Sequence, residues 1–560
     1  MQLIINIITI NFTIYIFGIF ASVYLIKIKT LKDNIHEAPL YGLILLGFLS
    51  LLINFLFPIN KIIGSLILII SIFFFIYHKL YYKNIFKKIL KNILIVSILT
   101  FILIAYSNIN RPDAGLYHLP FINIINENKI IFGLANIHSR FGYASILQYL
   151  SGLQNSYFLN LSSLNIPIAS IFSFSFIYFI KELKKNLNKE KIINSILIFL
   201  ITFYALIGFN RFSAYGNDVA AHLFLFIFFI MILNNFSILN QDIQSFKKIY
   251  LISVFLFSIK PFMAIIILIT FILFMANKKK IEILKNKLFW LINLFLFFWI
   301  LKTFIISGCL IYPLSKTCFN NLEYSNKDNT IAVAKIDEAW AKGWPDYKKK
   351  EINLDEFNKN FFWLDTWKAN HLKIIFKKLG PFIIFLILFL IILRIKKSNI
   401  KLQINKEVYI ILISSLSIIL IWFIKFPVYR FGNGSIITFI SVLFIIILNQ
   451  FKYMPQLTNL KKYFKIFIMV GIIIFITKNG LRMYDNKTNY NSKIWPDIYS
   501  EINNYKKVDL QLITDNGIKL YYYSFGNLCM YNKSPCSNYK IENLKKKNFF
   551  SYDYYYILNK

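Results

Sequence analysis

Charged residues, and acidic ones above all, are scarce in this sequence. The chain of 560 residues has 26 aspartate and glutamate residues against 63 lysine and arginine residues, and charged residues make up only 16% of it. A soluble domain carries roughly a quarter of charged residues. The low charge content therefore argues against a soluble protein of this length.

Short segments of alternating polar and apolar residues, which a membrane β-barrel requires, are also lacking. The apolar residues, 57% of the chain, instead form long runs with few charges. A helix of about 20 such residues crosses the hydrocarbon core of a bilayer. We therefore predict an all-α polytopic membrane protein with about 13–14 membrane helices, at 2–26, 39–58, 61–77, 92–108, 157–180, 191–209, 217–234, 249–276, 286–306, 373–394, 407–425, 432–449 and 464–479.

The formal net charge of +37 comes mostly from lysines in short connections between the apolar runs. This distribution is typical of cytoplasmic loops, so we do not expect nucleic-acid binding. The most basic connections are 27–38, 78–90, 181–190, 277–285, 395–406 and 450–463. Placing all of them in the cytoplasm predicts a multipass protein with both termini outside.

The run 249–276 fits this topology only if it does not cross the membrane once. It is basic at both flanks and contains Lys260-Pro261 near its middle. Proline interrupts a helix because it lacks the amide hydrogen and clashes with the preceding turn. We therefore predict two short helices that enter and leave on the cytoplasmic side, with Lys260 at the outer tip.

Cysteine is rare, and the predicted topology places all four cysteines outside the cytoplasm. Disulfides persist there and not in the cytosol. Neither pair has the short spacing that zinc sites favour. We predict two local disulfides, between Cys309 and Cys318 and between Cys529 and Cys536, with four free thiols as the alternative.

The chain divides into three predicted parts. Residues 1–90 would be accessory membrane helices, and residues 91–479 a membrane domain with outer loops 109–156 and 307–372. Residues 480–560 would form a small extracytoplasmic α/β or β appendage, because stretches such as VDLQLIT and IKLYYYSF flank the turn residues Asp515-Asn516-Gly517. In the first outer loop, residues 117–127 and 141–150 predict amphipathic helices at the membrane interface.

The first outer loop also holds Asp113, one of its two acidic residues, close in sequence to Arg111 and His118. A solvated aspartate in an interfacial loop is the simpler interpretation of Asp113. The loop's Arg140 is a further candidate for binding a substrate.

The next outer segment, NRFSAYGND at 210–218, contains Arg211 and ends at Asp218. His222 follows one turn later on the same helix face. Asp218 either stabilises the helix N-terminus through the helix dipole or belongs to a functional site, since ionisable residues at the membrane boundary are costly.

The predicted topology places most basic residues in the cytoplasm but puts two basic side chains outside it. These are Lys260 at the hairpin tip and Arg430 in KFPVYRFGNGS, near Lys425. Such cations suit an anionic headgroup such as a phosphate, or else extend to lipid phosphates. The second outer loop adds four tryptophans that form either an interfacial belt or surfaces for sugar stacking, namely Trp340, Trp344, Trp363 and Trp367.

Several stretches between about residues 90 and 450 resemble the GT-C superfamily of membrane glycosyltransferases. The sequence PDAGLYHLPFINIINENKIIFG (112–133) looks like the entry to their first periplasmic loop, and FSIKPFMAIIILI (257–269) resembles their "L-T-K-G" break. GLANIHSRFGYAS, SGCLIYPLSKTCF and VYRFGNG look closest to bacterial multipass proteins built on that plan. The chain differs in having Ala114, not a second acid, after Asp113, and three additional helices at the N-terminus.

The resemblance implies an inverting glycosyltransferase of the bacterial inner membrane, facing the periplasm and using a polyprenyl-phosphate-linked sugar as donor. Asp113 would be the general base, and His118 and Asp218 would orient acceptor or donor. Cationic and polar side chains would bind the substrate, namely Arg111, Arg140, Arg211, His222, Lys260 and Arg430. We expect membrane lipids as further partners and no cofactor or metal, although a divalent cation remains compatible with this chemistry.

Other function classes stay open at this point. A lipid-linked glycan flippase or transporter would also have many helices and buried charges. It would tend to show internal repeats and short loops on both faces, whereas this chain has no evident repeat and three long outer segments. A glycan polymerase or ligase would share the compartment and the kind of substrate, and an inactive scaffold would use the appendage for interactions.

Overall fold

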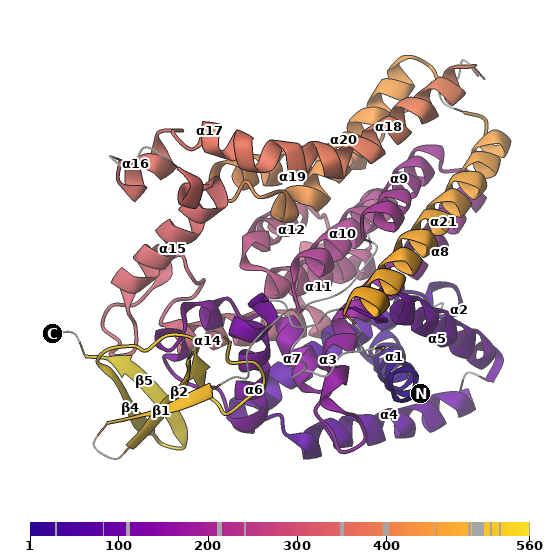
Figure 1. Cartoon of the computed structure of the whole chain (residues 1–560). Helices are drawn as coiled ribbons and strands as arrows, with labels where there is room; N and C mark the ends of the chain where they lie inside the picture. The colour runs from indigo at the N-terminus through magenta and orange to yellow at the C-terminus, as the bar shows by residue number, and fades with distance from the viewer. Residues whose placement is uncertain are drawn as a thin grey trace.

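The computed structural model describes residues 1–28, 31–81, 83–107, 112–209, 215–239, 242–347, 352–395, 402–453, 455–490, 494, 509–515, 518–525 and 528–558. The predicted site residues Arg111 and Arg211 lie outside the described residues. The described chain is mainly helical and ends in a small group of β-strands (Figure 1).

Each apolar run predicted to cross the membrane contains an α-helix, although the run 157–180 becomes α-helical only at Ile166. The corresponding helices are α1 (Gln2–Phe20, continued by the π-helical turn Ala21–Leu25), α3 (Ala38–Leu56), α4 (Lys61–Tyr81), α5 (Lys83–Ile104), α8 (Ile166–Asn188), α9 (Ile192–Gly208), α10 (Asp218–Leu239), α11 (Ile243–Ile259), α12 (Ala264–Ala276), α14 (Lys287–Ser307), α18 (Lys373–Ile395), α19 (Lys406–Lys425), α20 (Tyr429–Gln450) and α21 (Leu457–Tyr490). The shorter helices α2 (Leu31–Asn34) and α13 (Lys280–Leu284) lie in connections between them.

Among the described residues, nine helical stretches are long and apolar enough to cross a membrane. Three further apolar helices are shorter, at Ile192–Gly208, Asp218–Asn234 and Pro261–Ala276. The prediction of a mainly helical protein with many helices able to cross a membrane is therefore confirmed. The number of about 13–14 crossings remains a prediction.

The predicted interruption of the run 249–276 is confirmed. Helix α11 ends at Ile259, Lys260 has an extended backbone, and the 3₁₀ turn Pro261–Met263 leads into α12. The residue before a proline is disfavoured in the α conformation, which explains why the helix ends there. Phe246 near the start of α11 and Phe274 near the end of α12 have ring centroids 5.7 Å apart, so the two helices form an antiparallel hairpin.

Described residues of the basic connections 27–38, 78–90 and 181–190 lie together at one end of the helical bundle, which we call the lysine end. There, the Lys88 ammonium donates to the Lys32 carbonyl oxygen (2.7 Å), and the Gln244 amide to the Ile26 carbonyl oxygen (2.6 Å). The first residue of α10 and the Lys260 tip lie at the opposite end, the site end. Which end faces the cytoplasm remains a prediction.

The first outer loop packs tightly against the bundle. A π-helical turn (Ala114–His118) leads into α6 (Leu119–Glu127), and α7 (Ile146–Gly152) follows after two 3₁₀ turns at Leu134–Asn136 and Ser139–Tyr143. Residues 119–126 and 146–152 are all buried. Protein therefore covers the polar faces of both helices as well as their apolar ones, and their position at the membrane interface remains a prediction.

The second outer loop forms a separate small helical layer, seen next to α19 and α20 in Figure 1. It contains α15 (Lys327–Lys342), α16 (Leu354–Lys359) and α17 (Leu364–Trp367), with 3₁₀ turns at Ser315–Thr317 and Trp344–Asp346 and a π-helical turn at Lys368–Leu372. Its aromatic core includes Trp363 and packs against Trp422 of α19.

The C-terminal appendage is a β structure within the described residues. Strands β1 (Asp509–Asp515) and β2 (Ile518–Phe525) pair antiparallel, and β3 (Cys536–Ser537) pairs in parallel with β2. Strands β4 (Leu544–Phe549) and β5 (Tyr552–Ile557) form a second hairpin. Helix α21 continues through residue 480 to Tyr490, and the division of the chain at 90 and 480 stays a prediction.

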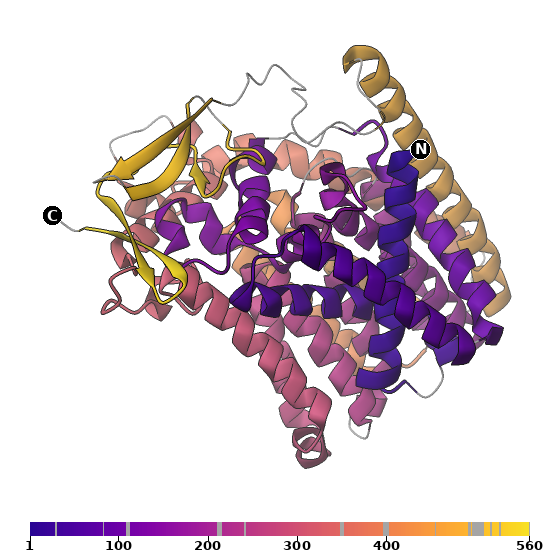
Figure 2. The ribbon, with the colours of Figure 1, turned by 90° about the horizontal axis from the view of Figure 1, so that it is seen from below.

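The appendage is attached to the first outer loop. The backbone amide of Met530 donates to the Gly115 carbonyl (2.9 Å), and that of Tyr555 to the Phe132 carbonyl (2.9 Å). The Tyr531 hydroxyl also donates to Asn126 (3.0 Å). Figures 1 and 2 accordingly show the β-strands beside α6, away from α21.

Both predicted disulfides are present. Cys309 pairs with Cys318 just after α14, and Cys529 pairs with Cys536 in the appendage. The alternative of four free thiols is therefore excluded, because the chain has no other cysteine.

Candidate functional site

Three charged side chains that the sequence singles out converge at the site end. The Lys260 ammonium lies 2.5 Å from Asp218 Oδ1, and Arg430 Nε lies 3.7 Å from Asp218 Oδ2. Lys260 also lies 3.6 Å from the centre of the Phe431 ring. Two cations thus share one carboxylate, which leaves positive charge available for an anionic ligand.

Each of these side chains comes from the end of a helix. Asp218 begins α10, Lys260 lies between α11 and α12, and Arg430 is the second residue of α20. A helix end leaves backbone groups and side chains accessible that the helix interior would cover. The side chains of Lys260 and Asp218 are 19% and 28% exposed, and that of Arg430 is 50% exposed, so the cluster is open to a ligand.

His222 holds the start of α20 in place below this cluster. Its Nε2 donates to the Arg430 carbonyl (2.7 Å), while its Nδ1 accepts from the Gly434 amide (3.2 Å). These two bonds define a neutral imidazole with the proton on Nε2. His222 therefore positions Arg430 from beneath, and both of its ring nitrogens are already occupied.

The glycines of the VYRFGNG motif permit close packing. A Cβ at Gly434 would lie 2.8 Å from His222 Nδ1, and one at Gly432 would lie 2.6 Å from the Trp422 ring. Asn433 between them accepts a hydrogen bond from the Tyr204 hydroxyl (2.5 Å). The motif thus fixes the direction in which Arg430 leaves the helix.

Tyr117 connects the first outer loop to the cation cluster. Burial raises the pKa of its phenol, and the charges of Asp113, Arg140, Arg430 and Asp218 all act on it. Tyr117 thus experiences charges from three separate segments of the chain. Asp113 itself is exposed at the N-terminus of the π-helical turn Ala114–His118.

His118 is buried and takes part in a local network. Its Nδ1 lies 2.6 Å from the Gln148 side-chain amide nitrogen, and the Gln148 carbonyl oxygen accepts from the Ser145 backbone amide. Burial lowers the pKa of His118 to about 3. His118 is therefore neutral at physiological pH and holds α6 against α7.

Sequence reasoning missed Asp337 on α15, which completes this region. Asp337 forms an ion pair with Arg140 (2.9 Å) and accepts a hydrogen bond from the Tyr143 hydroxyl (2.5 Å). Burial, followed by the neighbouring Asp337 charge, raises the pKa of the Tyr143 phenol. No local signal could identify Asp337, because its partners lie almost 200 residues earlier in the chain.

Two polar atoms just before Asp218 have no hydrogen-bond partner among the described residues. They are the hydroxyl of Tyr215, whose side chain is fully buried, and Oδ1 of Asn217. Buried polar atoms in proteins are normally paired with protein or ordered water.

A second buried cluster lies at the lysine end. His36, Glu37 and Glu182 place ligand-type atoms within 4.8 Å of one another, the arrangement that a metal ion could use. Their groups already have protein partners, since His36 contacts Glu182 (2.9 Å) and Lys248 contacts Glu37 (2.7 Å). This balance of charges indicates a structural network.

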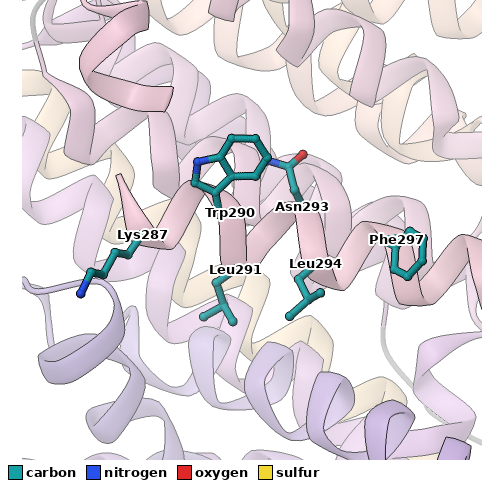
Figure 3. A pocket seen from close by; sticks show the side chains of 6 residues that line it. All are labelled: Lys287, Trp290, Leu291, Asn293, Leu294 and Phe297. Carbon is teal, nitrogen blue, oxygen red and sulfur yellow. The ribbon is translucent and has the colours of Figure 1, made fainter. Parts of the chain in front are cut away.

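A surface groove runs along α14, away from the charged cluster. Figure 3 shows its lining, which comes from that helix alone: Lys287, Trp290, Leu291, Asn293, Leu294 and Phe297. These residues occupy the half of α14 that begins at the lysine end. The groove therefore does not share the space around Tyr117.

Several helices of the described chain are long and apolar enough to cross a bilayer, which is consistent with a multipass membrane protein, and a polar cluster lies at one end of the bundle. The chain belongs to the family described as "Domain of unknown function (DUF8201)", which matches residues 1–437. The match includes Asp113, Asp218, Lys260, Asp337 and Arg430, and ends within α20. No curated protein and no solved structure matches the chain.

Proposed function

We propose that this protein is an inverting glycosyltransferase that moves a sugar from a polyprenyl-phosphate donor to an acceptor outside the cytoplasm. The supporting observation is the Lys260–Asp218–Arg430 cluster. The exposed carboxylate of Asp113 acts on the same tyrosine, Tyr117, as the charges of Asp218 and Arg430. A base and a phosphate-binding group are the two parts that this transfer needs. The choice of sugar transfer as the reaction rests on the resemblance of residues 112–133 and 257–269 to GT-C enzymes.

In this mechanism, an acceptor hydroxyl oxygen attacks the anomeric carbon from the face opposite the phosphate. The new glycosidic bond forms as the bond between the anomeric carbon and the phosphate oxygen breaks, so the configuration inverts. Asp113 takes the hydroxyl proton, and polyprenyl phosphate leaves with the bonding electrons. Proton transfer by a positioned base contributes about 10²–10⁴-fold to the rate of such reactions.

The cations would stabilise the leaving phosphate. Lys260 and Arg430 are held by Asp218 at 2.5 and 3.7 Å, so they are oriented before the ligand arrives. Preorganised charges stabilise developing negative charge without rearranging during the reaction. His118 and His222 would act by positioning, since their ring nitrogens bind Gln148 and the start of α20.

The role of Asp113 is tested by Asp113→Asn in cells that lack the native copy. The substitution keeps the size of the side chain and removes its basicity, so we expect transfer to fall by about 10²-fold or more. Cell-surface glycans would be compared by mass spectrometry. Asp365→Asn is a matched control, because Asp365 is also an exposed aspartate but lies on α17.

Unchanged glycans with normally inserted Asp113→Asn protein would remove Asp113 as the base. Accumulation of the complete glycan on its lipid carrier inside the cell would instead favour the flippase alternative. An increase in short chains at the surface would favour a polymerase.

Binding of the donor's phosphate is tested separately with polyprenyl phosphate and the purified full chain in lipid nanodiscs. Lys260→Gln and Arg430→Gln each remove one cation, and we expect each to weaken binding about tenfold or more, since charge-assisted contacts to phosphate are strong. Lys287→Gln on the α14 groove is the matched control. Equal binding by all four proteins would contradict a phosphate site at the cluster.

A further inference from the structure

The structure separates the four tryptophans of the second outer loop into two kinds. Trp363 and Trp367 are 1% and 8% exposed and belong to the aromatic core beneath α19, and Trp344 packs against the same core. Trp340 on α15 is 52% exposed. Three of the four therefore have a structural explanation, and Trp340 does not.

The surroundings of Trp340 are polar and belong to the candidate site. The guanidinium carbon of Arg430 lies 5.8 Å from the centre of the Trp340 ring, within the range of a cation–π contact. Asp337 precedes Trp340 by three residues, so both side chains lie on the same face of α15. A tryptophan that served only as a membrane anchor would not need charged partners on this face.

Asp337 is in turn connected to the first outer loop. Its two carboxylate oxygens bind Arg140 and Tyr143, and its side chain is still 15% exposed. Arg140 is 43% exposed and lies near Asp113, whose charge acts on it. An exposed aromatic ring, a carboxylate and a guanidinium thus lie on the side of the cation cluster where Arg430 contacts Trp340 and Arg140 pairs with Asp337.

We propose that Trp340 and Asp337 form a sugar-binding subsite, with the apolar face of a sugar ring packed on the Trp340 indole and its hydroxyls hydrogen-bonded to Asp337 and Arg140. This subsite rests on the proposed function and deepens it, because it makes a carbohydrate acceptor the substrate beside Asp113. Ligand sites combine aromatic surfaces with a few placed polar groups in this way. Arg430 would connect the sugar subsite to the phosphate-binding cluster.

The full chain in lipid nanodiscs would be screened by saturation-transfer NMR against a panel of free mono- and oligosaccharides. We expect at least one saccharide to bind the wild type, and Trp340→Ala to weaken that binding about tenfold. Trp340→Phe, which keeps an aromatic face, should stay within about threefold of the wild type. Asp337→Asn should weaken binding of the same saccharide through its lost charge.

Trp290→Ala is the matched control, because Trp290 is 58% exposed yet lies in the α14 groove (Figure 3). It should bind saccharide as the wild type does. If no saccharide binds the wild type, or if Trp340→Ala binds as well as the wild type, the subsite is disproved. A loss of binding in Trp290→Ala equal to that in Trp340→Ala would also disprove it, by indicating a general effect of tryptophan removal.

Polyprenyl phosphate binding, measured on the same preparations, separates the two proposals. Trp340→Ala should bind polyprenyl phosphate within about threefold of the wild type. Phosphate binding that depends on Lys260, without saccharide binding, would disprove the subsite and leave the proposed transferase standing. Saccharide binding that depends on Trp340, without phosphate binding, would leave a sugar site and remove the polyprenyl-phosphate donor.

Discussion

At the scale of single residues, the sequence identifies charged side chains at a predicted membrane boundary, but it does not identify the residues that they contact. Asp218, Lys260 and Arg430 stand out because ionisable residues at a membrane boundary are rare. The structure brings these three together. Asp337 could not be selected in the same way, because it is one of several acidic residues in a polar loop and only the fold shows that it meets Arg140.

Gly434 provides a sharp test of the support beneath Arg430. In Gly434→Ala the new Cβ would lie 2.8 Å from His222 Nδ1, a contact that forces the ring or the helix to move. Overpacking of this kind destabilises proteins by about 1–3 kcal/mol. We expect a lower thermal midpoint and weaker polyprenyl phosphate binding.

Gly380→Ala is the control for Gly434→Ala, since a Cβ there meets nothing within 4 Å. If Gly434→Ala matched Gly380→Ala in both stability and binding, the proposed support of Arg430 by His222 would be wrong.

The buried histidines of the first outer loop predict a loss of stability in acid. Burial, followed by the Arg140 charge, lowers the pKa of His138 to about 4, and burial lowers that of His118 to about 3. The unfolded chain binds these protons near pH 6.5, so it binds more protons than the folded chain below that pH. Each histidine therefore decreases stability by up to about 1.4 kcal/mol per pH unit as the pH falls from about 6.5 toward its folded-state pKa.

Thermal unfolding of the protein in detergent between pH 7 and pH 5 measures this effect. His138→Asn should remain folded at pH 7 and show a smaller decrease in its midpoint on acidification. An identical pH dependence in the wild type and the variant would show that His138 does not contribute.

At the scale of elements, the apolar runs and the proline predict the helices and the α11–α12 hairpin well, because both signals are local. The buried state of α6 and α7 could not be predicted. An amphipathic pattern shows which face is apolar, but not whether lipid, solvent or protein covers the other face. Here residues 528–558 and the neighbouring helices cover it, and the contact between Met530 and Gly115 spans more than 400 positions.

The buried network at the lysine end joins several elements whose contact the sequence does not reveal. Glu182 of α8 binds His36 before α3 and Asn234 of α10, while Lys248 of α11 binds Glu37. Removing one partner of a buried ion pair leaves an uncompensated charge and costs about 3–5 kcal/mol. We therefore expect Glu182→Ala to lower the thermal midpoint strongly.

Glu182→Gln should be milder, because its amide can still bind His36 or Asn234. The exposed Glu190, only eight residues later, gives the control Glu190→Ala, for which we expect almost no change. Equal stability of all three variants would show that the network does not hold the helices together.

At the scale of the whole molecule, the lysine distribution predicts which connections lie at the same end of the helical bundle. It does not show which end faces the cytoplasm. Contacts between 27–38, 78–90 and 181–190 follow from their shared position at the lysine end. Asp218 begins α10, and Asn234, which binds Glu182, lies about four helical turns further along it, so the proposed site is far from these loops. The orientation decides whether Asp113 meets periplasmic or cytoplasmic substrates.

Labelling of introduced cysteines with a membrane-impermeant maleimide settles this orientation. The four native cysteines are paired, so a single new cysteine provides the free thiol. We expect Asn329→Cys, exposed on α15, to react in intact cells, and Lys189→Cys, exposed at the lysine end, to react only after permeabilisation. The reverse pattern would place Asp113, Lys260 and Trp340 in the cytoplasm, where nucleotide sugars would replace polyprenyl-phosphate donors and the proposed reaction would lose its basis.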